Sequence, residues 1–167
     1  MKTFLTMVGF ILSVGLVGGG SGEAGGPKVP AFELRSLDGK LYSDQDLIGQ
    51  PTLLMFWASW CHVCQGELPK VHGLQEQMKG KKFQILAIGF ADPEANIRDY
   101  VASHPTHFNF PVLYDTGDRV ASQFGVRSTP TFFLLNKKGE VVIPYRGGGL
   151  LEHPQFQATL SQLLNEG

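Results

Sequence analysis

Two uninterrupted apolar runs constrain the fold of this chain more than any other feature of its sequence. Residues 52–59 read TLLMFWAS, and residues 83–90 read FQILAIGF. A short apolar run without alternating polar positions is typical of a strand that is buried on both faces of a sheet. Because both faces of such a sheet must be covered, the two runs predict a central sheet between layers of helices.

Strand-like and helix-like segments alternate along the rest of the chain. Residues 31–34 and 40–43 flank the turn LDG and indicate a short N-terminal hairpin. Further strands are expected at residues 111–114, 129–136 and 140–146, and helices at residues 61–80, 93–104, 118–125 and 154–166. The dipeptide Asp92-Pro93 is a strong helix start, with Asp92 as the expected N-cap.

This order of segments predicts an α/β domain in three layers, α/β/α, around a mixed central sheet. Parallel strands joined by helices form its core, and the last two strands add an antiparallel edge. The helix at 93–104 and the strand at 111–114 form a unit inserted into a minimal core. With 167 residues, of which 43% are hydrophobic, the chain can bury the core of one such domain.

The N-terminal region differs in kind from this domain. Residues 4–17 are almost wholly apolar, and this length fits a secretory signal better than a membrane span, which needs about 20 residues. We therefore divide the chain into a signal sequence or N-terminal membrane anchor (1–20), a Gly-rich linker (21–28) and one domain (29–167). The protein is expected to be periplasmic or otherwise extracytoplasmic, soluble or tethered by this segment, and removal of the segment stays open.

The charge pattern excludes one class of partner. The formal net charge is −1 and the basic residues are scattered, whereas a nucleic-acid-binding domain shows a strong basic excess. The one tight basic cluster, Lys79, Lys81 and Lys82, is interpreted as a solvated helix end, with phosphate binding as the alternative. No nucleic-acid partner is expected, and membrane contact is expected only through the N-terminal segment.

The two cysteines of the chain, Cys61 and Cys64, form a C-x-x-C at the predicted strand–helix junction. Free N–H groups and the helix dipole favour a thiolate there, so Cys61 is expected to be the exposed nucleophile. Cys64 lies one turn further in and can attack Cys61 once a mixed disulfide has formed. The loop between them is too small for a disulfide that mainly stabilises the fold. The pair therefore indicates a redox centre.

Metal binding is the main alternative chemistry for the cysteines. A structural zinc site needs four ligands, and the five histidines are dispersed, so no metal is expected. Thiolates suit Cu(I), and a copper site from the two cysteines with His153 or His107 stays open. Apart from the Cys61–Cys64 disulfide, no cofactor is expected.

Two motifs carry a resemblance to a known family. The stretch PTLLMFWASWCHVCQGELP (51–69) is similar to the strand–C-x-x-C–helix unit of the thioredoxin superfamily, specifically its exported TlpA/ResA-like branch. The stretch GVRSTPTFFLLNKKGEV (125–141) resembles the second signature of that fold, in which the Pro of the Thr-Pro pair is cis. The resemblance covers roughly residues 29–166 and implies a thioredoxin-like fold and an extracytoplasmic thiol–disulfide oxidoreductase.

The resemblance also implies roles for individual residues. Cys61 is the attacking thiol, Cys64 the resolving one, and Pro130 the cis-proline that faces the disulfide. Thr129 offers its backbone to an extended substrate segment. Glu67, three residues after Cys64, can share its helix face and handle the proton of the buried thiol. A solvated position on the helix surface is the alternative for Glu67.

Two residues next to Cys61 are expected to contact substrate. Trp60 is expected at the rim of the site, and His62 would stabilise a Cys61 thiolate if it lay near and were protonated. The dipeptide His62-Val63 lacks the common proline before the second cysteine. Met55 stands where thioredoxin has a buried aspartate, which places more weight on Glu67.

The resulting functional prediction is the reduction of partner-protein disulfides, for example in apocytochrome c during cytochrome c maturation. Such a protein also needs an upstream membrane thiol reductase, because thiols outside the cytoplasm tend to be oxidised. A disulfide oxidase or isomerase and a Cu(I)-binding assembly factor stay open as alternatives. The sequence leaves the redox potential and the partner open.

Overall fold

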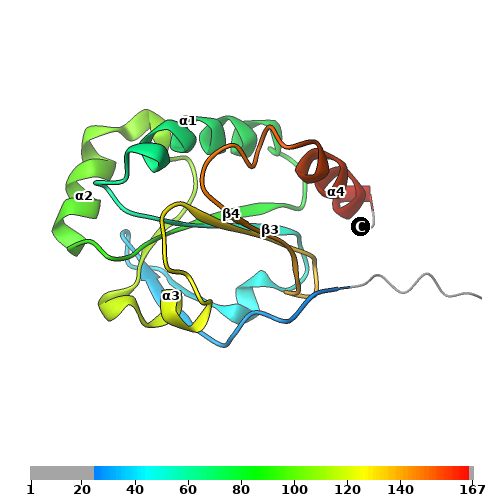
Figure 1. The fold of residues 1–167 in the computed structure, drawn as a ribbon, viewed down its shortest axis with the longest axis horizontal. Helices are drawn as coiled ribbons and strands as arrows, with labels where there is room; N and C mark the ends of the chain where they lie inside the picture. Colours follow the sequence, from blue (N-terminus) through cyan, green and yellow to red (C-terminus); the bar gives the residue numbers. More distant parts are fainter. Residues whose placement is uncertain (1–24, 166–167) are drawn as a thin grey trace, which may run out of the picture.

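The structure of the protein is a computed structural model that describes residues 25–165 (Figure 1). The strands are β1 (Glu33–Ser36), β2 (Leu41–Ser43), β3 (Thr52–Trp57), β4 (Gln84–Gly89), β5 (Val112–Tyr114), β6 (Thr131–Leu135) and β7 (Val141–Arg146). The α-helices are α1 (His62–Gln77), α2 (Glu94–Ser103), α3 (Arg119–Gln123) and α4 (Pro154–Asn165). Three short 3-10 turns are η1 (Asp44–Leu47), η2 (Pro105–His107) and η3 (Thr116–Asp118).

The strands form one mixed sheet in the order β2-β1-β5-β4-β3-β6-β7. The strands β3, β4 and β5 are parallel, whereas β6 is antiparallel to β3 and β1 is antiparallel to β5. The predicted N-terminal hairpin is β1–β2. The inserted unit is α2 with β5, and β5 extends the parallel core beside β4.

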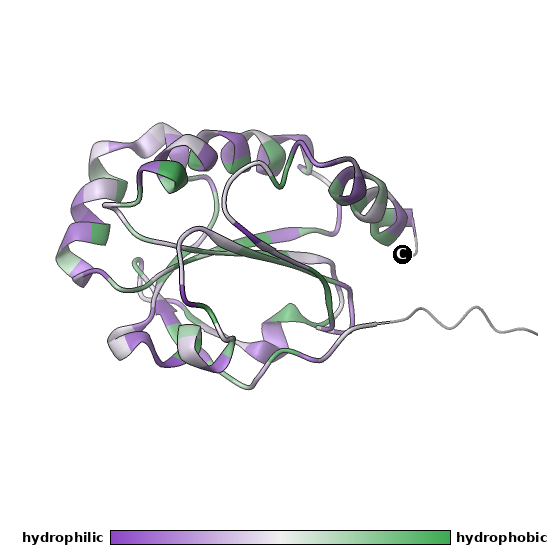
Figure 2. Ribbon diagram, in the orientation of Figure 1, coloured by the Kyte–Doolittle hydropathy of each residue, from purple (hydrophilic) through white to green (hydrophobic). Residues whose placement is uncertain are grey.

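Helices cover both faces of this sheet, as the two apolar runs predicted. Figure 1 shows α1, α2 and α4 on one face and α3 on the other. Side chains of β3 alternate between the two layers: Leu53, Met55 and Trp57 belong to the core under α1, and Leu54 and Phe56 belong to the core under α3. The helices carry both hydrophilic and hydrophobic residues, as expected for helices that cover a sheet with one face (Figure 2).

The predicted capping role of Asp92 is wrong. Helix α2 begins at Glu94, and its N-cap is Pro93 without a side-chain cap. The buried Asp92 carboxylate instead accepts hydrogen bonds from the backbone N–H of Ser59 (2.7 Å) and from Nδ2 of Asn96 (2.9 Å). A backbone N–H from the loop after β3 therefore competes successfully with the helix end for this carboxylate.

The predicted signal or anchor at 1–20 lies outside the described residues, as does the first half of the linker, 21–24. From residue 25 on, the chain lies along the start of β7. The backbone N–H of Val141 donates to the carbonyl of Pro27 (2.9 Å), and that of Val29 donates to the carbonyl of Gly139 (3.1 Å). Within residues 25–165, none of the helices has the length and apolar character needed to cross a membrane.

Truncating the centre of the sheet tests the importance of this core. Phe132 in β6 is fully buried and lies opposite Met55 of β3. The substitution Phe132→Ala should lower the free energy of unfolding by about 3–5 kcal/mol, because it removes apolar contacts and leaves a cavity. Urea unfolding measures this loss. The control Leu41→Ala, at a side chain that is 42% exposed on the edge strand, should change it by only ~0.5 kcal/mol; equal losses would contradict the placement of the core.

Candidate active site

The two cysteines form a disulfide at the N-terminus of α1. Cys61 is the N-cap of the helix, and its Sγ accepts a hydrogen bond from the backbone N–H of Cys64 (3.1 Å). The Cα atoms of the pair lie 5.2 Å apart. After reduction, the same N–H and the helix dipole would stabilise negative charge on the Cys61 sulfur.

The burial of the pair corrects one expectation. Cys61 is the more accessible of the two sulfur-bearing residues, but only 5% of it is exposed, and Cys64 is fully buried. The turn after β3 therefore leaves Cys61 almost wholly buried instead of on an open surface. A partner disulfide must therefore approach Cys61 closely and from a restricted direction.

The Thr129–Pro130 peptide bond is cis, as the resemblance implied. Sheet pairing places this bond near the cysteines, because Thr131 lies opposite Phe56 at the carboxyl end of β3. Pro130 is buried and Thr129 is half-buried. The carbonyl of Pro130 accepts a hydrogen bond from the backbone N–H of Gly147 (2.9 Å), which links it to the loop between β7 and α4.

Glu67 lies in the interior, not on the solvated surface of α1. It is 4% exposed, and its Oε2 is buried without a hydrogen-bond partner among the described residues. The loop after β7 packs directly on it. A Cβ atom at Gly148 would lie 3.1 Å from Oε1 of Glu67 and 2.9 Å from Cγ1 of Val63, so this close approach requires glycine. Glu67 is thus a buried carboxylate one turn after the resolving cysteine.

Lys70 neutralises this carboxylate and was not predicted from the sequence. Its Nζ lies 2.9 Å from Oε1 of Glu67 and 2.7 Å from Oε1 of Glu152. The hydrogen bond to Glu152 is the largest cause that raises the pKa of Lys70, and the hydrogen bond to Glu67 is the second. In turn, the hydrogen bond from Lys70 lowers the pKa of Glu152. The i, i+3 spacing of Glu67 and Lys70 is the signal that could have identified this pair, whereas Glu152 comes from the loop before α4.

An exposed apolar rim surrounds Cys61. Trp60 is 62% exposed and Val63 is 52% exposed, although both side chains are large and apolar. The indole N–H of Trp60 donates to the carbonyl of Ala91 (3.0 Å), which fixes the ring against the loop after β4. His62 is also exposed. Trp60 and His62, both expected to contact substrate, therefore lie where a partner protein can reach them.

The loop that holds Trp60 was missed by sequence reasoning. Ala91 has a positive φ of 52°, and its N–H donates to the carboxylate of Asp118 (2.7 Å). Next to Ala91, the carboxylate of Asp92 accepts a hydrogen bond from the backbone N–H of Ser59. Because these contacts join the inserted unit to the residues just before Cys61, α2 and β5 support the rim of the site.

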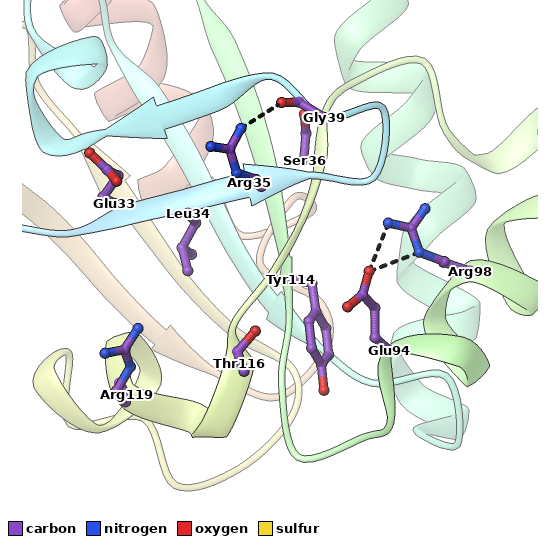
Figure 3. Close-up of a pocket in the computed structure, with 10 residues that line it drawn as sticks. All are labelled: Glu33, Leu34, Arg35, Ser36, Gly39, Glu94, Arg98, Tyr114, Thr116 and Arg119. Carbon is purple, nitrogen blue, oxygen red and sulfur yellow. Dashed lines mark hydrogen bonds and ion pairs between the residues drawn. The ribbon is translucent and has the colours of Figure 1, made fainter.

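A cavity of about 280 Å³ lies beside this supporting loop but does not include the disulfide (Figure 3). Its charged lining residues are Glu33, Arg35, Glu94, Arg98 and Arg119. Figure 3 shows Arg98 paired with Glu94 and Arg35 bonded to the carbonyl of Gly39, at 2.7 and 3.2 Å. These arginines are partly satisfied within the protein, and none of the predicted site residues lies here.

The described residues also bear on the copper alternative. Within residues 25–165, no group of three or more His, Cys, Asp or Glu side chains could hold a metal ion. The ring of His107 stacks on His104, and that of His153 lies beside Tyr145. The structure does not group either proposed third ligand with the cysteines.

Removing Lys70 tests the neutralisation of Glu67. The substitution Lys70→Met should lower the free energy of unfolding at pH 7, because it leaves the buried Glu67 carboxylate without its cation. The pair of Lys70 with Glu152 contributes only a small part of this loss, because both of its side chains are partly exposed to solvent. Since the pKa of Glu152 is lowered, that part is present above the ordinary carboxylate pKa of 4.5 and is lost as the pH falls through the lowered value.

Denaturant unfolding of wild type and variant at pH 7 and at lower pH measures this effect. The matched control is Lys79→Met, which removes an i, i+3 pair with Glu76 and should change stability much less, because both side chains of that pair are exposed. Equal effects of the two substitutions would show that Lys70 acts only as a surface charge.

The amino-acid sequence is similar to those of known thiol–disulfide oxidoreductases. The AhpC/TSA family matches residues 26–143. The thiol-disulfide oxidoreductase ResA of Bacillus anthracis is 32% identical over 135 residues, which cover 81% of this chain and 77% of the relative. ResA of Bacillus subtilis (strain 168) is 29% identical over 142 residues, which cover 85% and 78%.

Solved structures show the same fold. MTB DsbF, in its mixed oxidised and reduced forms, is 27% identical with a TM-score of 0.71, covering 83% of this chain and 98% of that one. The exposed lipoprotein thioredoxin Etrx1 of Streptococcus pneumoniae strain TIGR4 is 29% identical with a TM-score of 0.70, covering 80% and 100%. The thioredoxin-like fold predicted from the two motifs is confirmed, and the chain belongs to the AhpC/TSA family and, within it, to the ResA-like thiol–disulfide oxidoreductases.

Proposed function

We propose that the protein is exported and reduces disulfides of partner proteins through the Cys61/Cys64 dithiol. The observation that supports thiol–disulfide exchange at this pair most is the hydrogen bond from the Cys64 N–H to Cys61 Sγ at a helix N-terminus. That arrangement makes one sulfur of the pair the better nucleophile. Relatives named thiol-disulfide oxidoreductase ResA support the same chemistry.

The proposed reaction is a two-step thiol–disulfide exchange. The Cys61 thiolate attacks one sulfur of the partner disulfide, forming a mixed disulfide and releasing the other partner sulfur as a thiolate that takes up a proton. Cys64 then loses its proton and attacks Cys61 Sγ, which releases the second partner sulfur. Two electrons and two protons pass to the partner, and Cys61 and Cys64 end as the disulfide.

Glu67 is proposed to accept the Cys64 proton in the second step. Its buried Oε2 has no hydrogen-bond partner among the described residues, so this oxygen is available to a proton. Lys70 occupies the other oxygen. The arrangement leaves one free oxygen on a carboxylate one turn from the buried thiol.

Substrate binding is proposed to use the rim and the cis-proline loop. The backbone of Thr129 would pair with an extended partner segment, and Trp60 and His62 would contact its side chains. Apocytochrome c during cytochrome c maturation is the proposed partner, in the periplasm or an equivalent compartment. A membrane thiol reductase is proposed to return electrons to the Cys61–Cys64 disulfide.

The same exchange run in reverse would make the protein a disulfide oxidase or isomerase. One observation favours this second candidate: a donor N–H on Cys61 Sγ stabilises the thiolate, and a stabilised reduced form makes a disulfide more oxidising. The direction of electron flow therefore depends on the potential of the pair.

A trapping experiment tests the assignment of the two cysteines. The Cys64→Ser variant should accumulate a mixed disulfide between Cys61 and a disulfide-bonded peptide, because serine cannot resolve it. Non-reducing electrophoresis measures the adduct, and a reductant should release it. The matched control, Cys61→Ser, should give no adduct. If only the control forms one, Cys64 is the nucleophile and the proposed roles are exchanged.

Equilibration against glutathione redox buffers tests the direction of electron flow. If the protein is a reductant, the Cys61/Cys64 pair should have a reduction potential of about −270 mV. A value of about −120 mV would favour the oxidase. Because His62 is exposed, His62→Ala should shift the potential by less than about 30 mV. A larger shift would mean that His62 acts directly on the Cys61 sulfur.

A further inference from the structure

The end of the sheet opposite the disulfide carries a concentration of lysines. We define the basic face as Lys28, Lys81, Lys82, Lys137 and Lys138. These residues come from the start of the described chain, the loop between α1 and β4, and the turn between β6 and β7. Four of them are exposed and Lys137 is half-buried. Two segments of the basic face adjoin the amino ends of β3 and β4, whereas Cys61 follows the carboxyl end of β3.

A cavity of about 550 Å³ opens on this face. Its lining residues are Gly49, Pro51, Lys81, Lys82, Lys137, Leu163 and Leu164. Three lysines therefore share this lining with two leucines and a proline, and none of the lining residues is acidic. A lining of this kind suits a ligand with an anionic group and an apolar chain, because the lysines can bind the anionic group and the leucines and the proline can contact the chain.

A neighbouring cavity of about 380 Å³ extends the face. Lys28, Lys137 and Lys138 line it together with Ile48, which is 50% exposed. Asp44 is the acidic residue in this second lining. Lys137 lines both cavities, so the two adjoin each other, and each lining contains lysines together with apolar side chains.

The described chain begins on the same face. Pro27 and Val29 are hydrogen-bonded to the start of β7 and to the turn that holds Lys137 and Lys138. Figure 1 shows the first described residues and the C-terminal end of α4 on the same side of the molecule. The apolar segment at 4–17, a signal or anchor in the sequence analysis, is separated from residue 25 by seven residues. Seven extended residues span at most about 25 Å, so a membrane that held this segment would lie close to the basic face.

We propose that the basic face docks on an anionic phospholipid surface, with headgroup phosphates at the exposed Lys81 and Lys82. Clustered exposed lysines are attracted to anionic lipid headgroups within a Debye length, and Ile48 and the leucines of the larger cavity add apolar contact. This docking turns the Cys61 end of the sheet toward the aqueous compartment. Lys81 and Lys82, two of the three lysines interpreted above as a solvated helix end, would thereby have a function that is independent of the redox chemistry.

Vesicle binding by the full-length chain tests this proposal. Partition is measured by sedimentation with vesicles of phosphatidylcholine alone and with vesicles that also contain phosphatidylglycerol, so that binding by the N-terminal segment is common to both. Phosphatidylglycerol should increase binding of the wild type by about tenfold at low salt, and added salt should remove the increase. Lys81→Glu/Lys82→Glu should abolish the increase, whereas Lys81→Arg/Lys82→Arg should retain it.

The matched control is Arg119→Glu/Arg127→Glu, which makes the same change in net charge. Both arginines are exposed and lie beyond the carboxyl end of β5, away from the basic face. The control should keep the full response to phosphatidylglycerol. Equal binding of the wild type to both vesicles, or equal loss in both variants, would overturn the proposal. Displacement by inorganic phosphate beyond that by chloride at equal ionic strength would instead assign the lysines to a soluble anion.

Discussion

The burial of β3 is the constraint on which the rest of the structure depends. All six residues of the strand are buried, and its five apolar residues, 53–57, alternate between the core under α1 and the core under α3. A slip of one residue would exchange the two faces, and each side chain would then enter a space shaped for a different one, at a typical cost of about 1–3 kcal/mol. The register of β3 against β4 and β6 is therefore strongly specified. Its carboxyl end then places Cys61 at the N-cap of α1, and pairing with β6 places Pro130, just before that strand, beside it.

This placement gives two chemically identical cysteines different roles. Cys61 meets the free N–H groups of a helix end, whereas Cys64 lies fully buried above a carboxylate whose charge is balanced by Lys70. The helix end favours a thiolate at the first sulfur, and Glu67 offers a proton acceptor near the second. Lys70 is 44% exposed, so the cation that balances the buried carboxylate remains in contact with solvent. The asymmetry of the pair follows from the position of each sulfur along one helix.

Features that depend on neighbouring residues were predictable from the sequence, and those that depend on distant segments were not. The buried strands, the helix after the cysteines and the antiparallel edge follow from local hydrophobic periodicity and turn residues. The cis bond at Pro130 came from the resemblance. The cap assigned to Asp92 failed because the N–H of Ser59, 33 residues away in sequence, binds the carboxylate instead. The contact of Lys70 with Glu152 escaped for the same reason, since nothing local brings the loop before α4 to α1.

The two ends of β3 also explain how redox chemistry and membrane docking can coexist in one small domain. A six-residue strand is about 20 Å long, so a lipid surface at the basic face stands at least that far from Cys61. The Debye length at physiological ionic strength is about 8 Å, so the negative potential of the lipids is largely screened at the disulfide. The thiolate of Cys61 is then governed by the helix end and by the charges near it, not by the membrane. A docked domain could thus keep the reactivity that it has in solution while presenting Trp60 and Cys61 to partners in the aqueous compartment.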